Sequence, residues 1–436
     1  MNREADRMTA GGSALGRRKL FTLAAAGALA GLAGCGTGSP PPRTFRWLAI
    51  PTESVQSPTK ARAEYAQRVL ADYERTSGWQ VIPQVTVTDI DQAMAKLLLQ
   101  ASQHRAPEVA AVDSYLFPRF ARYANDLSKP MAEAGVRLGD WFPQFHPVMA
   151  STGQPRSLMF ETDVRVLFCR KDLVDRPPAS WDELLHAGRK AAAHGKQVLF
   201  AGARSEDSVD AVLWPFYWSQ GGQLLTADGR PGFAHGKGRQ AMVDALAFIR
   251  KLITEEVAPQ RVATIQSNDD INPDVVADRV SMFIGGSWQA SQLQELVTNG
   301  DFAKDWTIGP IPSRSGQGHT CMAGGWTWAS FAKDPEVARE SIRLLLDGYV
   351  ADEGMARWCT VSGNLPPRSP VYRNSAYHGD AFTELYREHL ARYARMRPLR
   401  KEYQQVSQAM QIALSSVTSL SAEPEAAVDA ALAQIV

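Results

Sequence analysis

Strand-like and helix-like segments alternate along this chain from residue 44 onward. Residues 44–50 and 81–87 are short apolar runs that we predict to be strands, and residues 60–75 between them have the pattern of a helix. Apolar side chains then repeat at helical spacing over residues 90–101, before a further predicted strand at residues 108–112. This alternation is typical of mostly parallel sheets covered by helices, so we predict an α/β fold.

Several later segments also favour helices. Ser180 and Glu183 have the spacing of a capping box, in which each side chain accepts a hydrogen bond from a free backbone N–H. Asp334 places a capping carboxylate before Pro335, at the first position of another predicted helix. From about residue 381 to the last residue, the pattern is almost entirely helical.

The first 34 residues have the order of an export signal. A basic cluster at residues 17–19 precedes an apolar run that is too short for a stable bilayer span. The run ends in Leu-Ala-Gly-Cys at Cys35 and resembles the lipobox of bacterial lipoproteins, in which this cysteine is acylated. The rival interpretation is a buried helix that contains a cysteine. We predict a signal peptide at residues 1–34, which directs export of the protein by the twin-arginine or the general route. A lipidated tether is predicted at residues 35–43.

Charge argues against a nucleic-acid partner. The chain has 47 Lys and Arg and 46 Asp and Glu, and residues 1–34 hold five of the basic and two of the acidic side chains. The remainder therefore has a formal charge of about −2 and no basic surplus. No later stretch approaches about eighteen consecutive apolar residues, so we expect only the signal peptide and the lipid to enter the membrane.

Motifs for metals, nucleotides and nucleophilic catalysis are absent from the sequence. There is no CxxC pair, no His/Cys cluster at zinc-ligand spacing, no Walker loop and no GxSxG motif. We therefore predict a binding protein without cofactor or metal, and no enzyme. With Cys35 assigned to lipid, we predict a disulfide between Cys321 and Cys359, and a buried free thiol at Cys169.

Tryptophans follow paired glycines at two places. Gly286 precedes Trp288 closely, and Gly325 precedes Trp326 and Trp328. Glycine lets backbone donors approach a ligand, and indole faces stack on the C–H faces of sugars. The alternative is that each Trp is an ordinary core residue. The candidate ligand-binding residues from this pattern are Gly286, Trp288, Gly325, Trp326 and Trp328, and Trp218 is added because it also lies near a glycine-rich loop.

Six short motifs, taken in order, resemble those of the extracellular sugar-binding lipoproteins of ABC importers, the maltose-binding-like family. The sequence PASWDEL at residues 178–184 is the closest of the six, and RVSMFIGGSW at residues 279–288 ends at Trp288. Cys169 and Arg170 stand where the family pattern has Tyr and Asn. The other four motifs lie at residues 106–109, 166–173, 308–312 and 362–366.

The resemblance implies two α/β lobes with a ligand cleft between them. Lobe one would comprise residues 44–160 with 326–364, and lobe two residues 161–325 with 365–436. It further implies a monomer that captures a small carbohydrate and passes it to ABC permease subunits. By position, it adds as ligand-binding candidates Glu53, Asp113, Tyr115, Glu161, Asp163 and Tyr403, and it gives Trp288 the role of a stacking residue.

Two other functions stay open at this point. A secreted glycosidase or lyase would use cleft carboxylates to cut an oligosaccharide. A receptor for glycerophosphodiesters would place the phosphate at glycine-rich loops or helix N-termini. Because the predicted site is rich in carboxylates and poor in Lys and Arg, we expect neutral or amino sugars to bind better than anionic ones.

Overall fold

The computed structural model describes residues 43–87, 90–297 and 300–435. The predicted signal peptide, Cys35 and the tether up to residue 42 lie outside the described residues. Residues 43–436 form one compact unit. None of the helices in the described part of the chain combines the length and apolar character that a membrane span requires.

A five-stranded sheet, in the order β2-β1-β3-β10-β4, organises the first group of elements. Its strands are β1 (Thr44–Ala49), β2 (Gln80–Val85), β3 (Val109–Asp113), β4 (Leu158–Met159) and β10 (Trp326–Ser330). Strand β1 is parallel to β2 and β3, whereas β10 runs antiparallel to both β3 and β4. Strand β10 comes from far along the chain and lies between β3 and β4.

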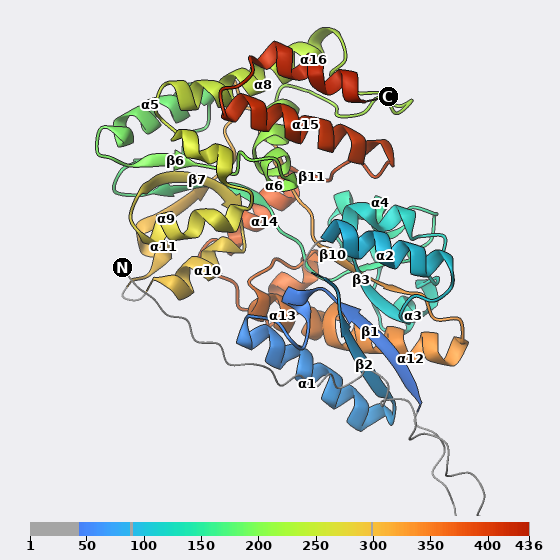
Figure 1. The fold of residues 1–436 in the computed structure, drawn as a ribbon. Coiled ribbons are helices and arrows are strands. Elements are labelled where there is room, and N and C mark those ends of the chain that lie inside the picture. Colours follow the sequence, from blue (N-terminus) through green and yellow to red (C-terminus); the bar gives the residue numbers. More distant parts are fainter. Residues whose placement is uncertain (1–42, 88–89, 298–299, 436) are drawn as a thin grey trace, which may run out of the picture. The chain divides into compact units, whose positions relative to one another are not determined.

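Four longer helices accompany this sheet (Figure 1). They are α1 (Lys60–Ser77), α2 (Ile90–Ser102), α12 (Pro335–Leu345) and α13 (Asp352–Ser362). Helix α1 packs on β2, α12 and α13, and α12 also packs on β10. The core beneath them is aromatic, because Trp47, Phe160, Trp328, Tyr349 and Trp358 form a continuous set of ring contacts.

A four-stranded sheet, in the order β6-β7-β5-β8, organises the second group. Its strands are β5 (Arg165–Arg170), β6 (Gln197–Leu199), β7 (Val280–Gly286) and β8 (Trp306–Gly309). Strand β5 is antiparallel to β7 and β8, and β6 is parallel to β7. The main helices of this group are α5 (Trp181–Ala192), α8 (Gly236–Thr254), α15 (Glu402–Thr418) and α16 (Pro424–Gln434).

Shorter elements complete the two groups, and some of them carry residues that line the cavity described below. The α-helical ones are α3 (Ser128–Glu133), α4 (His146–Met149), α6 (Glu206–Ser208), α7 (Trp214–Trp218), α9 (Asn272–Val276), α10 (Gln289–Leu296), α11 (Phe302–Asp305) and α14 (Thr383–Arg392). The 3-10 turns are η1 (Pro51–Glu53), η2 (Ser114–Arg119), η3 (Leu138–Asp140), η4 (Pro143–Phe145), η6 (Gln260–Thr264), η7 (Asn268–Ile271) and η9 (Ser369–Arg373). Two π-helical turns, η5 (Val209–Leu213) and η8 (Leu346–Val350), and the small pair β9 (Cys321–Met322) and β11 (Ala394–Arg395) complete the fold.

Both sheets are mixed, so the prediction of mostly parallel sheets is wrong in that detail. Alternation of strands and helices predicts parallel pairing for strands joined by one crossover helix, as between β1 and β2. It carries no information about pairs such as β10 with β3 or β5 with β7, which join segments far apart in the sequence. Both of these pairs, β10 with β3 and β5 with β7, are antiparallel.

The predicted helix starts are confirmed. Ser180 caps α5 by accepting a hydrogen bond from the Glu183 amide at 3.2 Å. The Glu183 carboxylate reaches back to the Ala179 amide at 2.7 Å, one residue before the position expected for a capping box. Asp334 caps α12 by accepting from the Glu336 and Val337 amides.

The predicted disulfide is wrong, because Cys321 and Cys359 are both buried free thiols. Cys321 lies in β9, whereas Cys359 lies in α13, where its thiol donates to the carbonyl oxygen of Phe160 at 3.7 Å. A disulfide needs two Cβ atoms within about 4.5 Å, which a count of cysteines cannot establish. Cys169 is a buried free thiol in β5, as expected.

Candidate ligand-binding site

A cavity of about 470 Å³ is lined by residues from both groups of elements. Glu53 and Asp113 reach it from the ends of the parallel strands β1 and β3, the edge at which α/β sheets commonly bind ligands. The segment between β4 and β5 adds Glu161 and Asp163. The full lining is Thr52, Glu53, Arg62, Ile90, Asp113, Tyr115, Glu161, Thr162, Asp163, Arg165, Glu206, Asp207, Asp210, Asp269, Trp288, Gln292, Met322, Gly324, Gly325, Trp326, Asn364 and Arg397.

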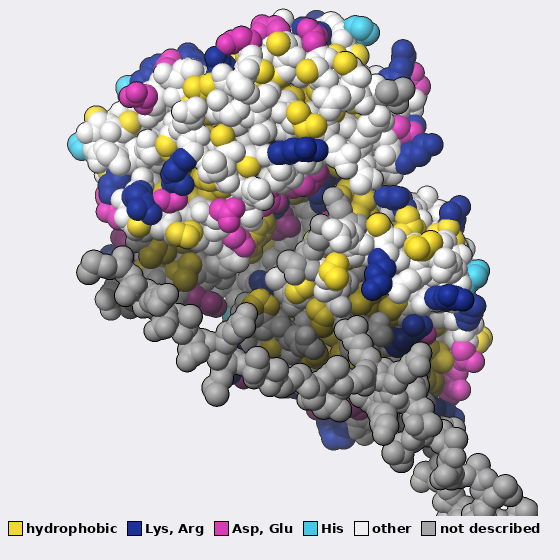
Figure 2. Space-filling view, viewed as in Figure 1, with side chains coloured by type: hydrophobic (Ala, Val, Ile, Leu, Met, Phe, Trp, Pro, Cys, Tyr) yellow, Lys and Arg dark blue, Asp and Glu magenta, His cyan; other side chains and the backbone are white. Residues whose placement is uncertain are grey.

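Carboxylates outnumber cations in this lining. The acidic members come from six different elements or loops, whereas the basic members are Arg62, Arg165 and Arg397. Figure 2 shows Asp and Glu side chains gathered around a hollow in the face viewed. In the described part of the chain, no group of three or more His, Cys, Asp or Glu side chains has the arrangement of a metal site. The carboxylates give the cavity many hydrogen-bond acceptors.

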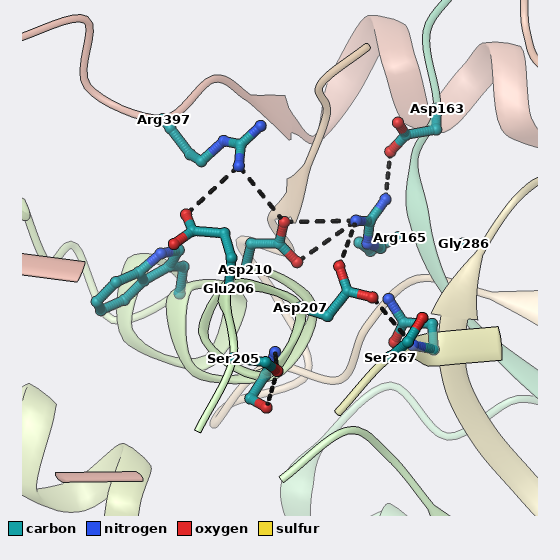
Figure 3. Close-up of polar contacts among 12 residues, drawn as sticks. Asp163, Arg165, Ser205, Glu206, Asp207, Asp210, Ser267, Gly286 and Arg397 are labelled. Carbon is teal, nitrogen blue, oxygen red and sulfur yellow. Dashed lines mark hydrogen bonds and ion pairs between the residues drawn. The ribbon is translucent and has the colours of Figure 1, made fainter. Parts of the chain in front are cut away.

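Arg165, the first residue of β5, is the centre of one ion-pair network (Figure 3). Its guanidinium pairs closely with Asp163 and lies 3.6 Å from Asp207 Oδ1 and 3.4 Å from Asp210 Oδ2. The residue is only 4% exposed, so these pairs are shielded from water. Their combined field raises the pKa of Arg165 although burial lowers it, and the side chain stays charged.

Arg397 forms a second network that shares Asp210 with the first (Figure 3). One guanidinium nitrogen lies 3.4 Å from Asp113 Oδ1, and the other lies 3.4 Å from Glu206 Oε1 and 3.9 Å from Asp210 Oδ2. The guanidinium carbon also lies 3.9 Å from the centre of the Tyr115 ring, within cation–π distance. Through these ion pairs and the ring contact, Arg397 connects β3 and the η2 turn to α6 and η5.

Glu206 is held by a set of donors behind the cavity wall. It accepts hydrogen bonds from the Tyr403 hydroxyl at 2.6 Å, from Gln411 Nε2 at 3.0 Å and from the Ser407 hydroxyl. Trp214 in turn donates its indole N–H to the Tyr403 oxygen at 3.1 Å. Ser205 caps the short helix α6 that carries Glu206. These contacts fix the carboxylate in place without ligand.

Glu53 and Glu161 form the other acidic end of the cavity. Arg62 Nη1 lies 3.5 Å from Glu53 Oε1, and Glu161 Oε2 accepts from Trp358 Nε1 at 2.8 Å and from Asn364 Nδ2 at 2.7 Å. Burial raises the pKa of Glu53 to about 7, against the opposing effect of Arg62. Burial also raises the pKa of Glu161 well above its usual range, and the charge of Glu53 adds to this.

Burial raises the pKa of other carboxyl groups in the cavity as well. The pKa of Asp113 rises to about 6, although Arg397 and the Tyr115 amide oppose the shift. The pKa of Asp163 is raised and that of Asp210 is raised well above its usual range, in both cases against Arg165. Desolvation therefore outweighs the arginines at each of these sites.

Trp288 forms an aromatic wall of the cavity, directly after β7. Its indole N–H donates to Asp269 Oδ1 at 2.7 Å, and its ring lies against Gly286 so closely that a Cβ there would be 1.9 Å from Trp288 Cζ3. The Gly286 amide donates to Gln289 Oε1 at 2.8 Å and does not line the cavity. Gly286 therefore supports the tryptophan rather than a ligand.

Residues 68–383 match the family described as bacterial extracellular solute-binding protein. The chain belongs to this family. One similar relative is a binding protein of Brucella abortus (strain 2308), which is 23% identical over 294 residues, or 65% of this chain and 67% of the relative.

Solved structures similar to this solute-binding protein share its fold. Maltose-bound MalE3 of T. maritima superposes with a TM-score of 0.73 at 20% identity, over 90% of this chain and 98% of the other. An ABC transporter solute-binding protein from Thermotoga lettingae TMO, bound with α-D-tagatose, gives a TM-score of 0.71 at 22% identity, over 90% and 98% of the two chains. The predicted two-lobed α/β fold is confirmed.

Eight of the twelve predicted site residues line the cavity of this solute-binding protein. Trp326 does so from the start of β10, where it is in register with Asp113 of β3. Gly325, just before it, adopts φ of +123°, and a Cβ there would lie 2.3 Å from the carbonyl oxygen of Glu161. The eight are Glu53, Asp113, Tyr115, Glu161, Asp163, Trp288, Gly325 and Trp326.

The other four predicted site residues lie elsewhere. Trp328 is fully buried in the core of the first sheet, against Trp47 and Phe160. Trp218 borders a separate hollow formed with Gln144 and residues 222–226, 394–396 and 398–400. Tyr403 stands behind the wall, where it binds Glu206, and Gly286 lies beneath Trp288. These four are therefore not part of the candidate site.

Several lining residues were not identified from the sequence. Ser205 with Ser208 gave a usable signal, because a serine followed by two acids is typical of a helix start and places Glu206 and Asp207 in a loop after β6. Arg397 lies in an irregular segment without such a signal. The residues missed are Arg62, Arg165, Glu206, Asp207, Asp210, Asp269, Gln292, Asn364 and Arg397.

Proposed function

We propose that this solute-binding protein captures a small carbohydrate in the cavity and delivers it unchanged to the transmembrane subunits of an ABC importer. The ligand class is a neutral or amino sugar of one or two rings. The observation that carries the proposal is a cavity of about 470 Å³ that combines buried carboxylates with the aromatic walls Trp288, Tyr115 and Trp326. Its volume falls within the roughly 300–1,000 Å³ of small-molecule sites.

The chemistry of the lining suits sugar hydroxyls. Each hydroxyl donates one hydrogen bond, and carboxylate oxygens are strong acceptors in a desolvated site. Aromatic faces complement the C–H faces of a pyranose ring, as Trp288 and Trp326 are positioned to do. The solved structures with the same fold contain maltose, a disaccharide, and α-D-tagatose, a monosaccharide.

The state of the arginines argues against an anionic ligand. Arg165 already contacts Asp163, Asp207 and Asp210, and Arg397 already contacts Asp113, Glu206 and Asp210. A phosphate would have to displace these carboxylates and then lie beside them in a partly desolvated site, which is costly. We therefore rank glycerophosphodiesters below neutral and amino sugars.

The mechanism we propose is closure of two lobes around the ligand, without chemistry, cofactor or metal. The lobes are residues 44–160 with 326–364 and residues 161–325 with 365–436, joined by crossing segments. A ligand that contacts both lobes shifts the population toward the closed form by its difference in affinity. A lipid on Cys35 would hold the monomer at the outer face of the membrane, near the permease.

A thermal-shift screen of the purified full-length protein tests this proposal. The panel contains mono- and disaccharides, amino sugars, sugar phosphates and glycerophosphodiesters. A ligand at one hundred times its dissociation constant stabilises the folded protein by about 2.7 kcal/mol. Stabilisation by glycerophosphocholine alone would replace the sugar proposal with the phosphodiester one.

The glycosidase or lyase alternative has a separate test. A long incubation with each oligosaccharide that binds is followed by chromatography of the recovered sugar. A receptor returns the ligand unchanged, whereas an enzyme yields shorter products. Cleavage that disappears in Glu161→Gln would show that the cavity performs chemistry.

A further inference from the structure

Glu53 is a buried acid that lines the proposed site and has a carboxylate oxygen without a hydrogen-bond partner among the described residues. The residue is 2% exposed and lines the cavity, and its Oε2 has no hydrogen-bond partner among the described residues. Its Oε1 lies 3.5 Å from Arg62, whose other nitrogen donates to the carbonyl oxygen of Ser362. A buried carboxylate oxygen without a donor is costly unless a donor arrives with the ligand.

Glu161 is a second buried carboxyl beside it, also 2% exposed. Its two hydrogen bonds, from Trp358 and Asn364, both go to Oε2. Both acids line the cavity, and the surroundings of the two are connected: Arg62, which pairs with Glu53, donates to Ser362, and Asn364, two residues further along, donates to Glu161. Two carboxyls thus meet at one end of the cavity.

Both ends of the cavity have fewer cations than carboxyl groups, and the end at Glu53 and Glu161 is the one with a carboxylate oxygen that lacks a donor among the described residues. Arg165 and Arg397 serve the five acids of the two networks, so that end has two guanidinium groups for Asp113, Asp163, Glu206, Asp207 and Asp210. Among the lining residues, Arg62 is the cation near Glu53 and Glu161, and it contacts Glu53 at 3.5 Å through Oε1 only. Ionisation of both acids would therefore leave one carboxylate without a cation.

We infer that the ligand of this cavity carries a protonated amine, which binds the carboxylates of Glu53 and Glu161. This inference rests on the proposed function, because it selects amino sugars from the neutral and amino sugars proposed above. A primary ammonium supplies three donors and one positive charge. One donor meets Glu53 Oε2 and a second meets Glu161, so the amine completes both the hydrogen bonding and the charge.

The inference predicts a pH dependence of binding with a definite sign. The titratable and charged groups that act on this pair are Arg62 of α1, Tyr349 of η8 and Cys359 of α13, besides the two acids themselves. Because burial raises the pKa of Glu53 to about 7 and also raises the pKa of Glu161, an ammonium must displace protons from the pair when it binds. Affinity for an amino sugar therefore rises from pH 5 to pH 7, below the range of about pH 7.7–8.0 in which such an amine loses its own proton.

Calorimetry with matched amine and hydroxyl ligands tests the inference on the full-length protein. The pairs are glucosamine with glucose, galactosamine with galactose, and the β-1,4-linked glucosamine dimer with cellobiose. We expect at least one amine to bind about tenfold or more tightly than its hydroxyl partner at pH 7.5, a difference of about 1.4 kcal/mol. Hydroxyl partners that bind as tightly as every amine would overturn the inference and leave the proposed function standing.

The opposite failure is also distinguishable. If glycerophosphodiesters bind and no sugar of either kind does, the proposed function fails. An amine series without a sugar ring, cyclohexylamine against cyclohexanol, then decides the inference by itself. Absence of binding by every amine at millimolar concentration overturns it.

Variants locate the amine. Glu53→Gln and Glu161→Gln should each reduce the preference for amine over hydroxyl by roughly tenfold and flatten its rise with pH. Glu353→Gln is the matched control, because this glutamate lies on α13 but is exposed and pairs with Arg357. If a cavity variant does not fold, the pH profile of the unsubstituted protein decides, and an amine affinity that is flat or falls from pH 5 to pH 7 overturns the inference.

Discussion

Arg165 lies over the indole of Trp288, with its guanidinium carbon 4.6 Å from the centre of the ring. The same guanidinium is held by three carboxylates, and the edge of the indole is held by Asp269. The tryptophan is therefore fixed in orientation before any ligand binds. Arg165 covers one face of the ring and Gly286 packs against its six-membered part, so a sugar can contact only the part of the indole that these two leave open.

We expect Trp288→Ala to weaken ligand binding by about 1–3 kcal/mol, because the stacking face is lost. Trp288→Phe keeps a ring but cannot donate to Asp269, so its loss should be smaller, about 1 kcal/mol. Calorimetry with the tightest ligand from the screen measures both. An unchanged affinity in a folded Trp288→Ala protein would show that this residue does not contact the ligand.

Removal of Arg165 should destabilise the fold as well as the site. Arg165→Ala leaves Asp163, Asp207 and Asp210 without their shared cation, and breaking such a buried pair costs about 3–5 kcal/mol. Arg170→Ala is the control at the other end of β5, where the partners Asp172 and Asp278 are exposed and the loss should stay below about 1 kcal/mol. Urea unfolding measures the difference, and equal losses would contradict the network.

Much of the fold was predictable because it depends on local patterns. The end of β3 at Asp113 and the η1 turn at Glu53 follow from short apolar runs that stop at polar residues. Parallel strands end at the same edge of a sheet, so both acids could be placed near a ligand. The direction of the other strands in each sheet depends on pairing between segments far apart in the chain. Local sequence patterns carry no information about such pairing.

The site was predictable only where its residues follow a strand. Arg397 is 284 positions from Asp113, and Tyr403 is 197 positions from Glu206, so nothing local indicates that they meet. Trp326 and Trp328 share one face of β10, as their spacing requires. Trp326 is at the end of the strand and reaches the cavity, whereas Trp328 lies two residues deeper in the core. The position of each tryptophan along the strand therefore decides whether it lines the cavity or lies in the core.

The raised pKa of Glu53 predicts that stability depends on pH. A carboxyl whose pKa rises from 4.5 to about 7 on folding contributes stability that is fully present below pH 4.5 and is lost as pH rises through 7. We expect the free energy of unfolding to fall by up to about 3 kcal/mol over this range, relative to Glu53→Gln. Urea unfolding at pH 4.5 and 7.5 tests it, and parallel pH profiles for the two proteins would contradict the shift.

The proposed lipid anchor has its own test. Cys35→Ala removes the thiol that would be acylated, so we expect an unprocessed precursor that lacks lipid when the gene is expressed in a bacterial host. Mass spectrometry of the intact protein distinguishes precursor from lipidated product. Cys359→Ala is the control, since that thiol is buried in α13 and should not affect processing. A Cys35→Ala protein that is still acylated would exclude the lipobox.

Gly325 should tolerate no side chain, because it supports the backbone of Glu161. Its φ is +123°, and a Cβ would lie 2.3 Å from the Glu161 carbonyl oxygen. Gly153 is a matched control, because its φ is +89° but a Cβ there would meet no atom within 4 Å. Gly153→Ala should cost about 1–2 kcal/mol from backbone strain alone, and Gly325→Ala at least about 2 kcal/mol more.

Because Glu161 must shift in Gly325→Ala, ligand affinity should fall as well, whereas Gly153→Ala should bind normally. Equal unfolding energies with equal affinities would show that the close approach at Gly325 is not needed.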